Sequence, residues 1–390
     1  MNAKLILKDG TIFEGKSFGA PLDVAGEVVF NTSMVGYPES FTDPSYTGQI
    51  LVLTYPLVGN YGIPDISRDK DKIEKTFESE KAQIKGLIVN EYSENFSHHS
   101  AKKSLGKWLK ENKIPAITGV DTRELTKKLR THGVMLGKIV TEKTATKTKN
   151  TTNTETFYDP NLENLVAKVS IKKPKIYHAK PIDTKSKKQK TIVCIDCGMK
   201  NNILRNFLNR GINVIRVPWN YDFLKENFNQ TAGKTASALI NGKKIPFDGI
   251  FISNGPGDPS TLKPLHEIIK KAFALKKPIF GICLGCQIMA LASGAKTYKL
   301  KFGHRSQNQP CIDLSTKPQK CYITSQNHGF AVDEKSLRPG WQVWLKNAND
   351  QTVEGIRHKT LPFFSCQFHP EAAPGPLDTT HFFDDFAKML

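Results

Sequence analysis

The C-terminal half of this 390-residue chain is predicted to form an α/β domain with a doubly wound, mostly parallel sheet. Apolar runs expected to be strands alternate there with segments expected to be helices, such as 262–275, and the expected strands include 191–195, 249–253 and 278–282. This alternation is typical of a parallel sheet with helices on both faces. Ligands bind such sheets at the carboxyl ends of the strands, so the loops at that edge are where we expect a site.

The N-terminal part, residues 1–140, is predicted to be a second, strand-rich domain of mixed α/β structure. Short β-branched runs are separated there by turn residues, and the expected strands include 4–7, 28–30, 50–53 and 82–89. Helices are expected over 101–109 and 122–129. A chain of this length suits two domains of roughly 100–200 residues each.

Residues 141–190 are predicted to link this domain to the C-terminal domain at 191–390. The segment contains 12 Lys and no Arg against five Asp and Glu, and its hydrophobic periodicity is weak apart from a short helix expected near 161–169. A Lys/Thr-rich composition of this kind is typical of a linker. The sequence assigns the segment no further role.

The overall composition narrows the class of protein. With 38% hydrophobic and 24% charged residues the chain is globular. The Lys-rich segment carries much of the excess of basic residues behind the net charge of +19, which favours a solvated or acidic-partner-facing stretch over a nucleic-acid-binding surface. Neither an apolar run long enough to span a membrane nor a secretory signal is evident, and seven cysteines favour reduced thiols. We therefore expect a bacterial cytoplasmic or plastid stromal protein that is not secreted and contacts neither nucleic acid nor membrane.

A candidate nucleophile, Cys283, lies in the sequence Gly-Ile-Cys-Leu-Gly at 281–285, between an expected strand and an expected helix. A sharp strand-to-helix turn strains its central residue and leaves room only for small residues two positions away. The thiol would lie at a helix N-terminus, where N–H groups favour the reactive thiolate, and the Leu284 N–H would be an oxyanion-hole donor. Taken alone, the pattern is equally consistent with a buried, inert cysteine.

A thiolate nucleophile also needs a base and a carboxylate that orients it, and the sequence Gln-Phe-His-Pro-Glu at 367–371 supplies both. His369 and Glu371 follow an expected strand and are separated by a proline that restricts the backbone. The carboxylate is then close enough to set the tautomer of the ring. Cys283, His369 and Glu371 are therefore the predicted catalytic residues.

The loop Ser-Asn-Gly-Pro-Gly-Asp-Pro at 253–259 follows another expected strand. Two prolines and two glycines could form an ordinary turn. Their functional interpretation is a rigid loop whose backbone N–H groups, that of Gly255 above all, face the site as the second oxyanion-hole donor and as contacts to the substrate.

A zinc site is the competing chemistry, because Cys194 and Cys197 form one C-x-x-C pair and Cys283 and Cys286 form another. Zinc ribbons usually separate such pairs by about 15–20 residues, whereas 198–282 intervene here. The pairs also flank a strand end and a strand-to-helix turn, not knuckle turns. We therefore expect no metal on this chain.

On the three motifs at 253–259, 281–285 and 367–371, the C-terminal domain resembles the class I, or triad, glutamine amidotransferases. That resemblance implies the class I fold and hydrolysis of glutamine to glutamate and ammonia through a glutamyl thioester on Cys283. It also implies that His369 protonates the departing ammonia and then activates water.

The N-terminal domain resembles that of the small subunit of carbamoyl-phosphate synthetase, on four stretches at 30–40, 43–46, 54–62 and 119–125. This resemblance implies a heterodimer, or a higher oligomer, with a large subunit that uses the ammonia, ATP and bicarbonate to make carbamoyl phosphate for arginine and pyrimidine biosynthesis. No cofactor is expected on this chain, because it lacks a phosphate-binding G-x-x-x-x-G-K-[ST] motif, and ATP and Mg are expected on the large subunit.

The same resemblance implies which residues bind L-glutamine: Ser45, Gly255, Gly257, Leu284, Gln287, Asn327, Gly329 and Phe330. One departure from the family pattern is Cys286, which stands where the family usually has histidine. That histidine is not part of the triad, so the departure concerns local packing and redox tolerance more than activity.

Two other hypotheses stay open: a glutaminase that serves a different synthetase, and a catalytically inactive binding module. The N-terminal domain disfavours the first. The intact set of Cys283, His369 and Glu371 disfavours the second.

Overall fold

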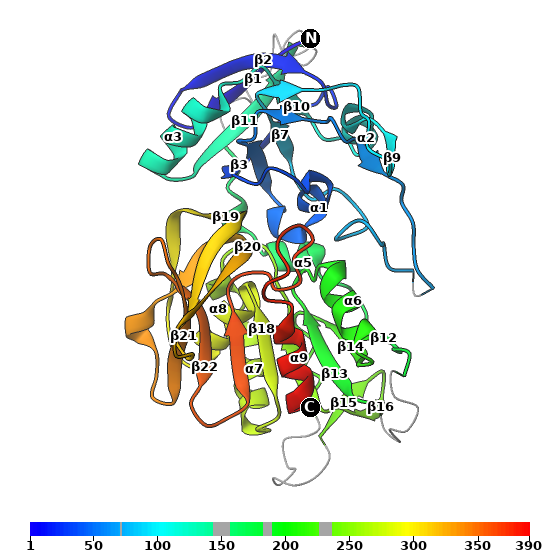
Figure 1. Ribbon diagram of the computed structural model, residues 1–390, viewed down its shortest axis with the longest axis vertical. Helices are drawn as coiled ribbons and strands as arrows, with labels where there is room; N and C mark the ends of the chain where they lie inside the picture. The colour runs from blue at the N-terminus through cyan, green and yellow to red at the C-terminus, as the bar shows by residue number, and fades with distance from the viewer. Residues whose placement is uncertain (71, 143–156, 182–188, 226–235) are drawn as a thin grey trace. The chain divides into compact units, whose positions relative to one another are not determined.

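A computed structural model describes residues 1–70, 72–142, 157–181, 189–225 and 236–390. The chain forms two compact units, Met1–Leu165 and Val166–Leu390, and the division falls inside the segment predicted as a linker. Much of that segment, at 143–156 and 182–188, lies outside the described residues. Figure 1 shows the elements of each unit along the chain.

The N-terminal unit is a closed barrel of seven strands in the order β1-β11-β3-β4-β7-β10-β2. The strands are β1 (Asn2–Leu7), β2 (Ile12–Ser17), β3 (Val24–Asn31), β4 (Gln49–Leu53), β7 (Gly86–Ile88), β10 (Ala116–Thr118) and β11 (Met135–Thr141). Three neighbouring pairs are parallel, namely β3-β4, β4-β7 and β7-β10, and the other pairs are antiparallel. The sequence predicted a strand-rich domain but not the closure of the sheet into a barrel.

Three α-helices and several short elements complete the N-terminal unit: α1 (Tyr37–Thr42), η1 (Pro44–Tyr46), β5 (Leu57–Val58), β6 (Ile63–Pro64), β8 (Glu91–Tyr92), β9 (Ala101–Lys103), α2 (Leu105–Glu111), α3 (Thr122–His132) and η2 (Pro160–Leu162). The helix predicted over 101–109 is wrong at its start. The hydroxyl of Ser104 accepts a hydrogen bond from Lys107 N and so begins α2 at the next residue, whereas β9 pairs with β6.

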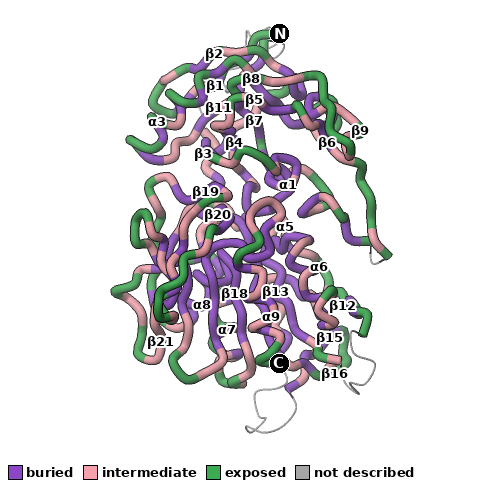
Figure 2. The backbone as a smooth tube through the Cα atoms, viewed as in Figure 1, coloured by how far each residue is buried: buried purple, intermediate pink, exposed green. Residues whose placement is uncertain are grey.

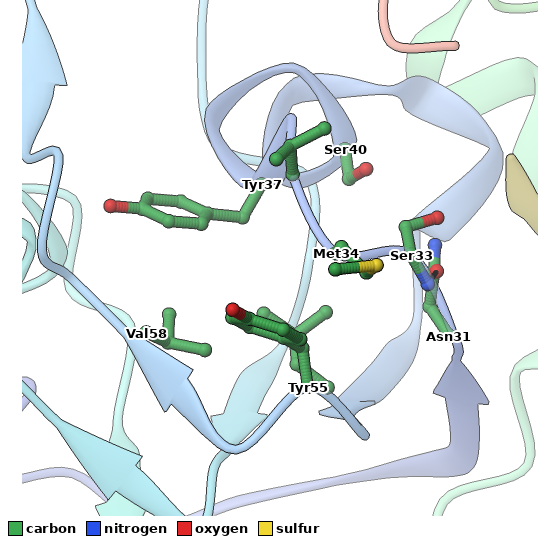
Figure 3. A pocket seen from close by; sticks show the side chains of 9 residues that line it. Asn31, Ser33, Met34, Tyr37, Ser40, Tyr55 and Val58 are labelled. Carbon is green, nitrogen blue, oxygen red and sulfur yellow. Dashed lines mark hydrogen bonds between the residues drawn. The ribbon is translucent and has the colours of Figure 1, made fainter.

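The loop after β3 borders a small pocket in the N-terminal unit (Figure 3). Asn31 organises this loop, because its side chain accepts a hydrogen bond from Ser33 N (2.6 Å) and donates one to the Tyr46 hydroxyl (2.7 Å). The loop leaves two apolar side chains, Met34 and Val35, more than half exposed. The lining residues are Asn31, Ser33, Met34, Val35, Tyr37, Ser40, Leu53, Tyr55 and Val58.

The C-terminal unit contains a ten-stranded sheet in the order β12-β14-β13-β17-β18-β23-β22-β21-β19-β20. Five neighbouring strands are parallel, as the sequence predicted: β14 (Asn213–Pro218), β13 (Thr191–Asp196), β17 (Gly249–Ile252), β18 (Ile279–Ile282) and β23 (Phe363–Cys366). This α/β architecture confirms the predicted fold class. Figure 2 shows these central strands as buried.

The rest of this sheet is antiparallel, a feature that the sequence did not reveal. Its strands are β12 (Lys175–Tyr177), β19 (Thr297–Asp313), β20 (Lys320–Val332), β21 (Trp341–Asn347) and β22 (Val353–His358). β12 lies inside the predicted linker, so part of that segment belongs to the sheet. A separate hairpin pairs β15 (Ser237–Ile240) with β16 (Lys243–Pro246).

Helices cover both faces of the parallel strands. Successive residues of a strand point to opposite faces, so strands that are apolar throughout must be covered on both. On one face Phe251 and Phe280 join an aromatic cluster with Phe207 of α6 (Asn201–Asn209) and Phe383 of α9 (His381–Met389). On the other face the neighbouring isoleucines contribute to the core that includes residues of α7 (Lys263–Ala274) and α8 (Leu284–Ala292). A short helix, α5 (Leu165–Val169), precedes this unit's first strand.

Phe280 should be a main contributor to the stability of the C-terminal unit. Its side chain is fully buried and contacts several other rings, so Phe280→Ala should lower the free energy of unfolding by about 3–5 kcal/mol in chemical denaturation. The control, Leu377→Ala, removes a side chain that is 69% exposed and should change it by less than about 0.5 kcal/mol. Equal effects of the two substitutions would contradict the assigned core.

Candidate active site

Cys283 lies between β18 and α8 and has φ 54° and ψ −105°, a conformation that L-residues other than glycine rarely adopt. Its backbone N–H donates to Cys366 O at 2.8 Å, which ties the turn to the end of β23. The side chain is 2% exposed, and its sulfur contacts Asn327 O at 3.7 Å. The strained turn predicted from the sequence is therefore present, with the thiol at the carboxyl edge of the sheet.

The two glycines of the turn are required by close backbone approach. A Cβ on Gly281 would lie 2.7 Å from Gly285 O, and a Cβ on Gly285 would lie 2.2 Å from Ile252 O. Real Cβ atoms do not come so close to other atoms, so any side chain would displace the turn. The Gly-x-Cys-x-Gly spacing thus has a steric cause, in the contact of the two glycines with each other and of Gly285 with β17.

The loop after β17 brings Gly255 beside the turn. A Cβ on Gly255 would lie 2.2 Å from Cys197 O and 2.9 Å from a methyl carbon of Leu284, so glycine is needed there as well. Leu284 is the first residue of α8, and N–H groups in a first helical turn have no partner within the helix. The two residues predicted to form the oxyanion hole are therefore neighbours.

His369 and Glu371 follow β23 and are both buried. The ring Nδ1 lies 2.7 Å from Glu371 Oε1, and His369 N donates to Ser325 O at 2.8 Å. The other ring nitrogen, Nε2, is buried without a hydrogen bond among the described residues, and Cys283 is close enough to affect the pKa of the ring. The structure thus brings together the three residues predicted as a triad.

A buried lysine, Lys200, also belongs to the site, and it was not predicted from the sequence. Its Nζ lies 3.0 Å from Glu371 Oε1 and donates to Ala372 O at 2.5 Å, and its side chain is 3% exposed. Its backbone N–H donates to the side chain of Asn254 at 3.2 Å, so the loop after β13 contacts the loop after β17. A lysine in the loop that follows an apolar strand, in a domain whose strand ends form the site, was the available signal.

These charges shift the pKa values of the pair strongly. Burial raises the pKa of Glu371, but Lys200 and His369 outweigh burial and lower it to about 2. Burial lowers the pKa of His369, but Glu371 and Cys283 outweigh it and raise the pKa to about 10. At neutral pH the ring is therefore cationic and the carboxylate anionic.

Both shifts stabilise the fold over a defined pH range. The contribution of His369 is complete below its ordinary pKa of 6.5 and is lost as the pH rises through about 10. The contribution of Glu371 is complete above its ordinary pKa of 4.5 and is lost as the pH falls through about 2. The two contributions are therefore complete together between pH 4.5 and 6.5.

Four residues that the resemblance assigns to glutamine lie close to Cys283 along α8 and β20. Gln287 is buried and donates its side-chain amide to Phe330 O at 2.9 Å, which connects α8 to β20. The backbone carbonyl oxygen of Asn327 contacts the Cys283 sulfur. Gly329 lies between Asn327 and Phe330 in β20. Gly257 has φ +87°, which favours glycine. The Asn327 carbonyl thus borders the thiol, and the part of these residues in binding glutamine stays a prediction.

Ser45 is the predicted glutamine-binding residue that belongs to the N-terminal unit. It lies in η1, is 8% exposed, and its backbone N–H donates to the Asp43 side chain at 2.9 Å. Its part in binding glutamine therefore stays a prediction.

Cys286 is a packing residue of the apolar cluster between α8 and the antiparallel strands. It is fully buried, and burial raises the pKa of its thiol to about 12. The paired cysteines at 194, 197, 283 and 286 do not form a metal-binding group in the part of the chain that the structure describes, where the candidate group is His304, His328 and Glu354. The zinc alternative based on cysteine pairs thus lacks geometric support.

Comparison with protein families agrees with this geometry. Residues 193–389 match the family "Glutamine amidotransferase class-I", which covers half of the chain. The chain therefore belongs to the class I glutamine amidotransferases.

The N-terminal unit narrows the kind of amidotransferase. Residues 5–139 match the family "Carbamoyl-phosphate synthase small chain, CPSase domain". The two matched domains together are those of a carbamoyl-phosphate synthase small chain.

Similar proteins span this chain within much longer sequences. "Multifunctional protein URA2" of Saccharomyces cerevisiae is 50% identical over 406 residues, "Multifunctional protein CAD" of Squalus acanthias is 49% identical over 388, and "Carbamoyl-phosphate synthase [ammonia], mitochondrial" of Homo sapiens is 45% identical over 391. These matches cover 99–100% of this chain but only 17%, 16% and 24% of the relatives.

Among the described residues, each helix is too short or too polar to span a bilayer.

Removing the Lys200 charge should strongly destabilise the protein. Lys200→Met leaves the buried Glu371 carboxylate without its lysine partner, so the free energy of unfolding should fall by about 3–5 kcal/mol. The matched control is Lys388→Met, which removes an exposed lysine whose Nζ lies 3.1 Å from Asp385 and should change it by less than about 1 kcal/mol. Chemical denaturation of both variants measures the difference, and similar losses would refute the role of burial.

The Glu371 carboxylate should control the pKa of His369. Glu371→Gln removes the largest interaction that raises the ring's pKa, which should fall from about 10 by roughly one to three pH units. NMR titration of the His369 ring measures this change. His358, whose pKa is lowered by burial elsewhere in the unit, is the internal control and should titrate identically in both proteins. An unchanged His369 titration would contradict the assigned coupling.

Proposed function

We propose that this chain is a glutaminase that hydrolyses L-glutamine to glutamate and ammonia with Cys283, His369 and Glu371. The observation that carries the proposal is the buried contact of His369 with Glu371 beside a cysteine held at a strained strand-to-helix turn. Membership of the class I glutamine amidotransferases supports the same chemistry.

In the first step Cys283 attacks the carbon of the side-chain amide of glutamine as a thiolate, with its proton held on the cationic His369 ring. The N–H groups of Gly255 and Leu284, two residues in close contact, stabilise the developing oxyanion in this proposal. The C–N bond then breaks, and the cationic His369 ring gives its proton to the nitrogen, so that ammonia leaves and a glutamyl thioester remains.

In the second step the neutral His369 ring takes a proton from water, and the resulting hydroxide attacks the thioester carbon. The C–S bond breaks, glutamate is released and the ring returns to its cationic form. Glu371 holds Nδ1 throughout, and Lys200 compensates the carboxylate charge that supports the imidazolium. In the C-terminal unit, Gly257, Asn327, Gly329 and Phe330, with Gln287, bind the substrate in this proposal.

The ammonia is passed to a large synthetase subunit, which forms carbamoyl phosphate from ammonia, bicarbonate and ATP. The carbamoyl-phosphate synthase domain at residues 5–139 supports this partner. The synthetase activity, with its ATP and Mg, belongs to the partner in this proposal, and the complex serves arginine and pyrimidine biosynthesis in a cytoplasm or plastid stroma. The partner is either a separate chain in a heterodimer or a further part of one polypeptide, since this chain spans a quarter or less of the relatives it matches.

Cys283→Ala should affect carbamoyl phosphate formation from glutamine but not from free ammonia. With a matching large subunit, the variant should lose glutamine-dependent carbamoyl phosphate formation by roughly 10³-fold or more and keep ammonia-dependent formation, because only the release of ammonia from glutamine is lost. Product formation from each nitrogen source measures both activities.

The control is Cys321→Ala, which removes the exposed cysteine and should leave both activities unchanged. Retained glutamine dependence in Cys283→Ala would refute the nucleophile. Loss of both activities would refute the division of labour between the chain and its partner.

A further inference from the structure

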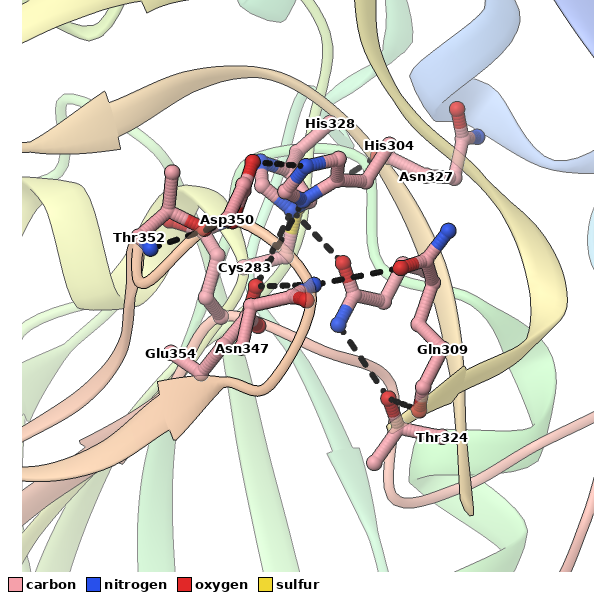
Figure 4. Close-up of polar contacts among 12 residues, drawn as sticks. Cys283, His304, Gln309, Thr324, Asn327, His328, Asn347, Asp350, Thr352 and Glu354 are labelled. Atoms are coloured by element: carbon pink, nitrogen blue, oxygen red, sulfur yellow. Dashed lines mark hydrogen bonds and ion pairs between the residues drawn. The ribbon is translucent and has the colours of Figure 1, made fainter. Parts of the chain in front are cut away.

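Three buried side chains from three strands of the C-terminal unit converge behind the candidate active site. His304 of β19 and His328 of β20 are paired directly opposite each other, and Glu354 comes from β22 (Figure 4). Glu354 Oε1 lies 3.5 Å from His304 Nδ1 and 3.9 Å from His328 Nε2. One atom from each residue lies within 4.8 Å of the others.

Two buried polar atoms of these residues lack hydrogen bonds. His304 Nδ1 and Glu354 Oε2 have no hydrogen-bond partner among the described residues. The Glu354 side chain is fully buried, and that of His304 is 9% exposed. Buried polar atoms are normally paired, so these atoms indicate that the site binds something more.

The opposite nitrogen of each ring is held by an acceptor. His328 Nδ1 lies 2.8 Å from Phe330 O, and His304 Nε2 lies 2.9 Å from an Asp350 carboxylate oxygen. A proton on each of these nitrogens donates to the acceptor and leaves a lone pair on the other nitrogen. Metal-binding histidines are oriented in this way, with the non-ligating N–H on a carboxylate or a backbone carbonyl.

We propose that His304, His328 and Glu354 bind a divalent metal ion, with zinc as the fitting ion. Two imidazole nitrogens and one carboxylate oxygen are a common set of zinc ligands. Tetrahedral coordination at the usual bond lengths puts ligand atoms roughly 3.3 Å apart, close to the separations found here. The side-chain oxygen of Gln326, 3.1 Å from His328 Nε2, lies where a fourth ligand or a water contact is needed. This departs from the sequence-based expectation that the chain has no metal.

The competing occupant of the site is a proton. Burial lowers the pKa of His304, but Asp350 and Glu354 outweigh it and raise the pKa to about 9, so a cationic ring would also pair with these carboxylates. Arg305 and His369 are the other basic groups that act on His328. A metal ion satisfies both lone pairs and the Glu354 carboxylate at once. A proton on His304 instead leaves His328 Nε2, which then carries no proton, facing the carboxylate.

A metal in this place would fix the strand that borders the thiol. His328 lies directly after Asn327, whose carbonyl contacts the Cys283 sulfur, and its Nδ1 holds the carbonyl of Phe330. The metal would therefore act by positioning β20, and it would not contact the reacting atoms.

Cobalt binding to the 390-residue chain, freed of metal by a chelator, tests the site. The wild-type chain should bind one Co²⁺ with the visible absorption of tetrahedral nitrogen and oxygen coordination, and Zn²⁺ should displace it. Glu354→Gln and His328→Asn should each weaken binding by at least about tenfold. His98→Asn, which alters an exposed histidine, should bind like wild type. Circular dichroism checks the fold of each variant.

Asp350→Asn keeps the test decisive if the buried variants fail to fold, because Asp350 is partly exposed and its contact with the proposed ligands is to the far ring nitrogen of His304. It should weaken cobalt binding by roughly 10–100-fold. The proposal is overturned if the wild-type chain binds neither ion, if Asp350→Asn and the folded variants bind as well as wild type, or if the absorption is that of thiolate ligands.

Discussion

The buried Glu371 carboxylate is the interaction on which the site depends. A charge removed from water must be paired, and this one is paired on the same oxygen by the His369 ring and by Lys200. These partners come from loops that follow two different strands, so the pairing fixes both loops at one edge of the sheet. It also accounts for a ring that is cationic and a carboxylate that is anionic at neutral pH.

The parallel strands bring the remaining parts to this edge. Cys283 follows β18, Gly255 follows β17 and His369 follows β23, and these three strands are neighbours in the sheet. The distances of closest approach are set by backbone contact, which only glycine permits at 255, 281 and 285. The glycines of these two motifs are therefore steric requirements of close backbone packing at this edge.

The sequence predicted the parts of the fold that depend on local periodicity. The parallel strands and the helices between them lie close to their expected positions, because buried strands and amphipathic helices differ within a few residues. The antiparallel half of the large sheet and closure of the N-terminal barrel were missed, because both depend on pairing between distant segments. The helix expected from residue 101 failed at its start, where a capping serine begins the helix later.

The sequence by itself determined the nucleophile, its base and the orienting carboxylate as candidates, because each belongs to a short motif with its own chemical logic. Only the tertiary structure decided that Lys200 compensates Glu371 and that His304, His328 and Glu354 converge. Lys200 contacts a backbone carbonyl 172 residues away, and the converging side chains come from three strands. Contacts of this kind leave no local pattern, because they depend on strand order and on the loss of water around buried charge.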